Sequence, residues 1–219
     1  MARDPRLRSV PLGSPAPRPV ALQGSLHERA LDDLGFIRST MERAAAYTAI
    51  PGWGGVRMGL TALVAAPIAL RAPNREQWFA TWLIAAALGL SIGFYEMLRK
   101  ARAERVSLFT GAGSRFAKAL APGLIAGALL TLVVYFTHQT ALLPGLWLLL
   151  YGVAVISAGA YSIREVRSMG LAFMLVGAVA LLGITWSHEA RAFGDLCMAA
   201  GFGVLHVIYG VTIARSRHG

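Results

Sequence analysis

Apolar residues dominate six stretches of the chain between Trp53 and Ala214, namely 53–70, 77–98, 116–136, 142–162, 168–186 and 192–214. A helix needs about 20 apolar residues to cross the hydrocarbon core of a bilayer, and each stretch is close to that length. The pattern therefore predicts an all-α protein, a six-helix transmembrane bundle.

Charged residues avoid the middle of these stretches, and the fourth and fifth contain none. Arg57, Glu96, Lys118 and Asp195 lie near the ends of their spans, where we expect their side chains to reach the interface. His206 is the one acidic or basic residue expected at mid-depth. We expect it to be neutral and bonded to a neighbouring hydroxyl, for example that of Ser91 or Thr131.

The cationic residues predict the orientation of the bundle. Of the 21 Lys and Arg residues, 17 fall in segments that alternation of the spans places on one side of the membrane: the N-terminal segment, 99–118, 163–167 and the C-terminal tail. Three fall in the loops on the opposite side. Cytoplasmic loops carry this excess in membrane proteins, so both termini are predicted to be cytoplasmic, with the protein in the inner membrane. Trp78, Trp82, Trp147 and Trp186 are then expected at the outer interface.

The residues before the first span divide into two parts. Residues 1–24 hold five of the ten prolines and predict a disordered arm. Residues 25–50 predict a cytoplasmic amphipathic helix that Pro51 and Gly52 end. One face of it carries an apolar stripe at alternating spacings of four and three residues: Ala30, Leu34, Ile37, Met41, Ala44 and Thr48. Residues 215–219 form a short cytoplasmic tail.

Glycine recurs in the spans at spacings typical of close helix packing. The first three spans each contain a pair four residues apart, and the fourth has a seven-residue repeat: Gly55 and Gly59, Gly89 and Gly93, Gly123 and Gly127, then Gly145, Gly152 and Gly159. The change in period between the halves suggests a three-plus-three arrangement.

One string suggests catalysis, since Gly89 to Gly93 reads G-L-S-I-G around Ser91. At 1.5 Å per residue, Ser91 and His206 both lie roughly 12–14 Å above the inner end of their spans, so a Ser–His dyad is geometrically possible. The pair resembles the dyad of rhomboid proteases, which also have six spans and a His in the last one. Rhomboids carry the serine in span four, however, so both residues are expected to be structural, with no catalytic residue.

Cofactors, metals and nucleic acid are not expected. His138 and His188 fall in outer loops, so His206 lacks a second haem ligand at its depth. His138, His188, Glu189 and Asp195 have no metal-ligand spacing. The net charge of +10 follows the positive-inside pattern. The single cysteine, Cys197, cannot form an internal disulfide.

Three stretches carry a family resemblance: L-G-F-I-R-S-T-M-E-R-A at 34–44 leading into I-P-G-W-G-G at 50–55, L-L-P-G-L-W at 142–147, and A-G-F-G at 200–203 followed by His206. They resemble a group of bacterial multi-spanning membrane proteins with no assigned activity. The resemblance implies a cytoplasmic helix ahead of the spans and a cytoplasmic partner, with winged-helix regulators encoded nearby.

These observations favour a non-enzymatic regulatory or scaffolding protein that contacts a cytoplasmic protein, or a second copy of itself, through helix 25–50. The partner-binding face would comprise Ala30, Leu34, Ile37, Met41 and Ala44. A small permease is the alternative, and a rhomboid-like protease using Ser91 and His206 is the third interpretation.

Overall fold

A computed structural model of the 219-residue chain describes residues 29–37, 41, 47–105, 107–109, 111–187 and 189–216. Residues 29–37 are helical and belong to a unit that ends at Ala44, separate from the unit that starts at Ala45. Residues 1–24, and 25–28, 38–40 and 42–46 of the predicted helix, lie outside the described residues, as do 217–219.

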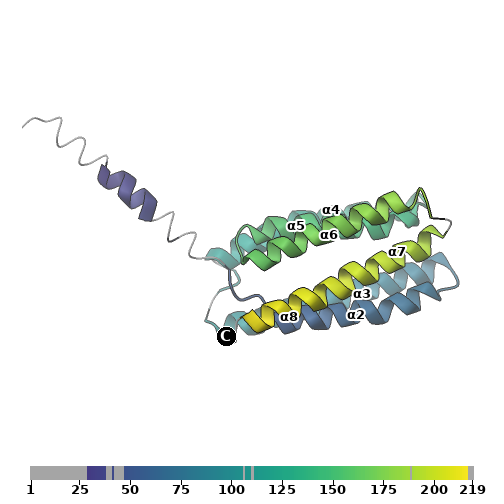
Figure 1. Ribbon diagram of the computed structural model, residues 1–219, viewed down its shortest axis with the longest axis horizontal. Helices are drawn as coiled ribbons and strands as arrows, with labels where there is room; N and C mark the ends of the chain where they lie inside the picture. Colours follow the sequence, from purple (N-terminus) through teal and green to yellow (C-terminus); the bar gives the residue numbers. More distant parts are fainter. Residues whose placement is uncertain are drawn as a thin grey trace, which may run out of the picture. The chain divides into compact units, whose positions relative to one another are not determined.

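The prediction of an all-α bundle with six spans is confirmed, and the chain is a multi-pass integral membrane protein. The spans are α2 (Gly52–Leu70), α3 (Arg75–Ala103), α4 (Gly111–Phe136), a 3-10 turn with α5 (Thr140–Leu142 and Leu143–Gly159), α6 (Arg164–Gly183), and a last span. That span contains α7 (Ala190–Met198), a π-helical segment (Ala199–Leu205) and α8 (His206–Ser216) (Figure 1).

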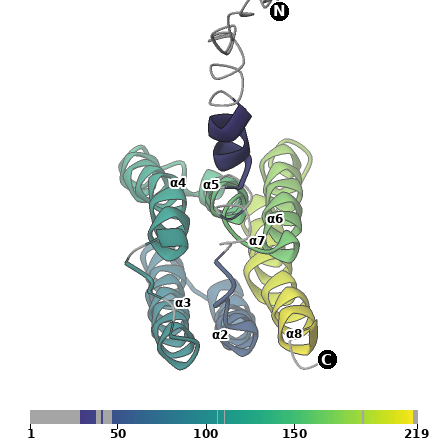
Figure 2. The same cartoon turned by 90° about the vertical axis from the view of Figure 1, so that its left-hand side faces the viewer.

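The six spans form two rows, which Figure 2 shows nearly end-on. One row contains α3, α2 and the last span, with α2 in the centre, and the other contains α4, α5 and α6, with α5 in the centre. The most extensive packing is between α5 and α6. The rows therefore combine the first, second and sixth spans against the third, fourth and fifth, and they do not follow the two halves of the chain.

Local chemistry explains several helix ends. The Asn74 side chain caps α3 by accepting a hydrogen bond from the Gln77 backbone N–H at 2.9 Å. At the C-terminal end of α2, a distant residue supplies the hydrogen bonds. Arg191 donates to the carbonyl oxygens of Ala72 at 2.7 Å and Ala69 at 3.3 Å. The Ala69 carbonyl also accepts from the Ala72 N–H at 3.1 Å, and Ala72 lies just past the end of α2. The guanidinium therefore ties the C-terminal end of α2 to the start of the last span.

Most glycines named from the sequence lie where another helix approaches. A Cβ at Gly59 would fall 2.6 Å from the Gly203 carbonyl oxygen, and one at Gly152 would fall 2.8 Å from that of Gly170. Gly55, Gly93, Gly123, Gly145 and Gly159 likewise face atoms within 3.5 Å. Gly127 has only Leu150 at 3.9 Å, and Gly89 has no atom within 4 Å. Gly89 therefore borders open space.

The prediction of one helix across 25–50 is wrong at its C-terminal end, because residues 47–50 are not helical. Tyr47 instead forms a parallel bridge with Ser162, with its N–H donating to the Tyr161 carbonyl at 2.7 Å and its own carbonyl accepting from Ser162 Oγ at 2.8 Å. Pro51 also disfavours helical backbone at Ile50. We call the end of the bundle that holds this bridge the Tyr47 end.

Candidate functional site

His206 lies at the junction of the π-helical segment and α8 and is only 3% exposed. Its Nδ1 is 3.0 Å from the Phe202 carbonyl oxygen, and its Nε2 is 2.9 Å from the Tyr151 hydroxyl. A carbonyl can only accept, so Nδ1 carries the proton and Nε2 accepts from the Tyr151 O–H. The expected hydroxyl partner is thus Tyr151, on α5, rather than Ser91 or Thr131.

Aromatic rings surround this pair. The rings of Phe173 and Phe202 have centroids within 5.3 Å of the Tyr151 ring and of each other, and Phe173 also meets the His206 ring edge-on at 5.1 Å. Such offset and edge-to-face arrangements are the favourable ones for aromatic pairs. The cluster joins α5, α6 and the last span, and so connects the two rows of helices.

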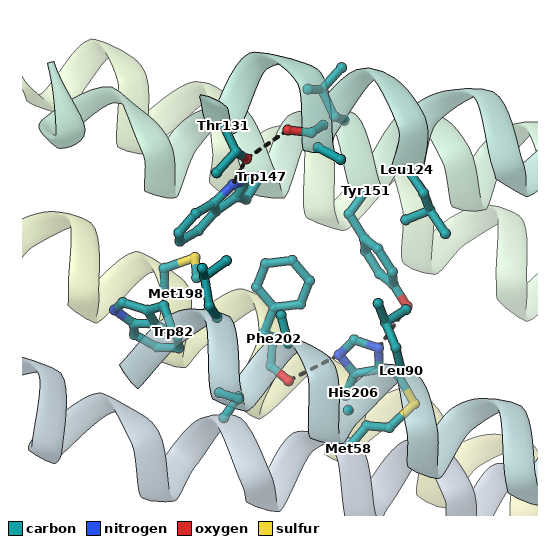
Figure 3. A pocket seen from close by; sticks show the side chains of 18 of the residues that line it. Met58, Trp82, Leu90, Leu124, Thr131, Trp147, Tyr151, Met198, Phe202 and His206 are labelled. Atoms are coloured by element: carbon teal, nitrogen blue, oxygen red, sulfur yellow. Dashed lines mark hydrogen bonds between the residues drawn. The ribbon is translucent and has the colours of Figure 1, made fainter. Parts of the chain in front are cut away.

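Two cavities meet at the Tyr151–His206 pair. The first, of about 250 Å³, extends away from the Tyr47 end and is lined by residues that include Trp82, Gly89, Thr131 and Trp147 (Figure 3). The second, of about 400 Å³, extends towards Ile50, Pro51 and Phe116. Both are lined by Met58, Leu90, Leu124, Tyr151 and His206. Together they run along the inner faces of α3 and α4.

Polar atoms that line the first cavity are already paired. Thr131 Oγ1 accepts from Trp147 Nε1 at 2.7 Å and donates to the Gly127 carbonyl at 2.6 Å (Figure 3). The indole of Trp82 donates to Asp195. With His206 and Tyr151 also bonded to each other, the walls offer no unpaired donor, and an ion entering the cavity would lose its hydration without replacement.

The structure does not assemble the Ser91–His206 dyad. Ser91 is exposed, and its hydroxyl donates to the Ala87 carbonyl of its own helix at 2.7 Å. The Nε2 atom of His206, which a general base would use, is occupied by Tyr151. Gly89 and Leu90 line the first cavity, but Ser91 lies on another face of α3.

The prediction that the Asp195 side chain reaches the interface is wrong, because Asp195 is 0% exposed. Its Oδ1 accepts from Trp78 Nε1 at 2.7 Å and from Trp82 Nε1 at 2.8 Å, whereas its Oδ2 is buried with no hydrogen-bond partner. The two indoles are 2% exposed, so they are core residues rather than the interfacial anchors predicted from the sequence. The carboxylate joins the last span to α3.

Glu96 is also buried, at 3% exposure, so the prediction that its side chain reaches the interface is wrong as well. It accepts from Arg99 of its own helix, at 2.8 Å, and from Arg57 of α2. The predicted local pair with Arg99 is present, and the partner on α2 adds an inter-helix link. A buried carboxylate with two guanidinium partners is the arrangement that low-dielectric surroundings require.

Tyr47 is fully buried, and its hydroxyl has no hydrogen-bond partner. Burial and the nearby negative charge of Glu104 raise its pKa to about 12. Its ring packs on Phe116 at 5.3 Å, and Phe116 lines the second cavity. The chain that precedes α2 therefore contacts a wall of that cavity.

Among the described residues, no group of three or more His, Cys, Asp or Glu side chains could hold a metal ion. Arg75 contacts His138, and Glu189 lies in the loop before α7.

Sequence reasoning missed Tyr151, the π-helical segment and the Trp–Asp195 contacts. The spacing of Trp78 and Trp82, four residues apart on one helix face, was the available signal for the last of these.

No protein-family model, no curated protein and no solved structure matches this chain.

Proposed function

We propose that the protein is a non-enzymatic regulatory or scaffolding element of the bacterial cytoplasmic membrane, which contacts a cytoplasmic protein through residues 25–50. The observation that carries the proposal is the anchored base of that segment. Tyr47 and Ala49 are both 0% exposed, and Lys100 Nζ donates to the Ile50 carbonyl at 2.9 Å. A simple tether would not need a buried, hydrogen-bonded connection to the bundle.

The second support is the exposed apolar stripe. Leu34, Ile37 and Met41 are 62%, 52% and 68% exposed. Exposed side chains of this size at helical spacing suit a groove on another protein, and Met adapts easily to different surfaces.

Charge separates a protein partner from a lipid surface. Residues 25–50 contain three arginines and four acidic residues, which gives the segment a net charge of −1: Arg29, Arg38 and Arg43 against Glu28, Asp32, Asp33 and Glu42. A helix that lies on an anionic bilayer normally has a Lys/Arg-rich polar face. The segment lacks that face, so a protein is the better-matched occupant of the stripe.

Site-specific photo-cross-linking tests the proposal in the full-length protein in native membranes. A photoreactive residue at Ile37 or Met41 should form an adduct with the same protein, and one at Asp32, on the opposite face, should not. Leu34→Asp should abolish the Ile37 adduct while leaving the amount of protein in the membrane unchanged. Adducts with lipid alone, or protein adducts that survive Leu34→Asp, would refute the proposal.

A small permease is the second candidate, and the interior favours it. The two cavities meet at a buried polar pair, and the adjoining span contains a π-helical segment, a feature frequent at functional sites. Because the polar side chains of the cavity walls are already hydrogen-bonded within the protein, the walls would suit an uncharged solute. Membrane-impermeant maleimides, added to either face of proteoliposomes, test this with Met198→Cys and Met169→Cys in a Cys197→Ser background. A permease requires both positions to react, so failure of either one would exclude it.

A further inference from the structure

We propose that the two cavities form one slot between α3 and α4 that holds an acyl chain of an anionic bilayer phospholipid. This site is separate from the partner-binding segment proposed above. It is assigned by the length of the slot, by its lining, by its opening towards the surrounding lipid and by the charge at one end.

The slot is long and narrow. Along α3 its lining runs from Trp82 to Met97, and along α4 from Phe116 to Thr131. Each stretch advances 15 residues, which is about 22 Å of helix. A bilayer core about 30 Å thick gives each leaflet chains about 15 Å deep, so the slot can accommodate one acyl chain along its length.

The lining selects hydrocarbon. It consists mainly of Ala, Gly, Leu, Met and aromatic residues, and the polar groups of Thr131, Tyr151 and His206 are paired within the protein. A hydrocarbon chain needs no hydrogen-bond partner, and it gains dispersion contacts with these walls. The open space at Gly89 and the loose approach at Gly127 leave room for it on both helices.

The slot opens sideways. Leu83, Leu90 and Phe94 line it and are also 43%, 52% and 55% exposed, so part of each side chain faces the slot and part faces outward. Because α3 and α4 are membrane spans, outward here means the lipid phase. A chain can therefore enter from the bilayer without crossing water.

The Tyr47 end supplies the charge for the headgroup. Arg102 near the end of α3 and Lys118 near the start of α4 are exposed cations at that end. Glu96 is buried there, and its carboxylate is neutralised by Arg57 and Arg99. Cations at one end of an apolar slot favour an anionic headgroup over a zwitterionic one.

Two cavity-filling variants test the proposal in purified full-length protein in lipid nanodiscs. The probe is phosphatidylglycerol with a diazirine on its acyl chain, and adducts are mapped by peptide mass spectrometry. We expect adducts at Leu90 and Leu124. Gly89→Phe and Gly127→Leu should abolish both, since each fills the slot from a different helix. Ile84→Phe, on the exposed face of α3, should leave them unchanged.

Circular dichroism and gel filtration check that the variants fold. Adducts that persist at full yield in both filled variants would overturn the site, as would adducts confined to outward positions such as Ile84. Equal labelling by the same diazirine chain on phosphatidylcholine would overturn the anionic headgroup. A dimer cross-linked through α3 and α4, without acyl adducts, would assign the slot to a second copy instead. No outcome depends on a cytoplasmic partner, and a chain held in the slot would exclude a solute from it.

Discussion

The buried carboxylate of Asp195 gives the sharpest prediction, because its removal leaves two indole N–H groups without an acceptor. Trp78 and Trp82 are 2% exposed, so water cannot replace the lost oxygen. Hydrogen bonds between transmembrane helices contribute about 0.6 kcal/mol on average and up to about 1.7, so losing two of them should cost about 1–3 kcal/mol of unfolding free energy. We therefore expect Asp195→Ala to destabilise the bundle by that amount.

The matched control is Asp195→Asn, which keeps a carbonyl oxygen in the position of Oδ1. Its amide group would occupy the site of Oδ2, which already lacks a partner, so its cost should be smaller than that of Asp195→Ala. The measurement is SDS-induced unfolding in mixed micelles followed by circular dichroism.

A double-mutant cycle isolates the cause. In a background with Trp78→Phe and Trp82→Phe, no indole donor remains, so the cost of Asp195→Ala should largely disappear. If Asp195→Ala costs the same in that background as in the native protein, the hydrogen bonds do not account for the destabilisation. The carboxylate would then stabilise the bundle through Arg191, the nearby cation on the same span.

The remaining predictions concern topology, packing and pH. A periplasmic-active reporter should be active when fused after Thr140 and silent after Ser216, and activity at the second position would contradict cytoplasmic termini. Gly59→Leu should destabilise the bundle, since its Cβ would meet a carbonyl at 2.6 Å, whereas Gly89→Leu should be tolerated in the same unfolding assay. The folded state keeps the Tyr47 phenol protonated up to a pKa of about 12, against 10.0 normally, so its contribution to stability should be complete below pH 10 and lost as the pH rises towards 12. Unfolding across that range, compared with Tyr47→Phe, measures the difference, and identical pH profiles would contradict the assigned pKa.

The anchored segment shows where a local pattern ceased to be sufficient. The apolar stripe continues to Thr48 at helical spacing, which favoured one helix to residue 50. The Tyr47 backbone instead pairs with Tyr161 and Ser162, more than 100 residues further along the chain. Helical spacing cannot anticipate a partner at that separation, because the pairing exists only after α5 and α6 have folded together.

The sequence by itself determined the number of spans and their approximate limits. The thickness of the bilayer imposes a length on each apolar stretch, and that requirement is local to the stretch. Only the tertiary structure decided what each side chain faces. A span that is apolar on all sides carries little periodic signal for its inward face, so its rotation follows from packing against its neighbours. The rotation of the spans buried Asp195 against two indoles and left the slot open beside Gly89. It also placed His206 within hydrogen-bonding distance of Tyr151 rather than of Ser91.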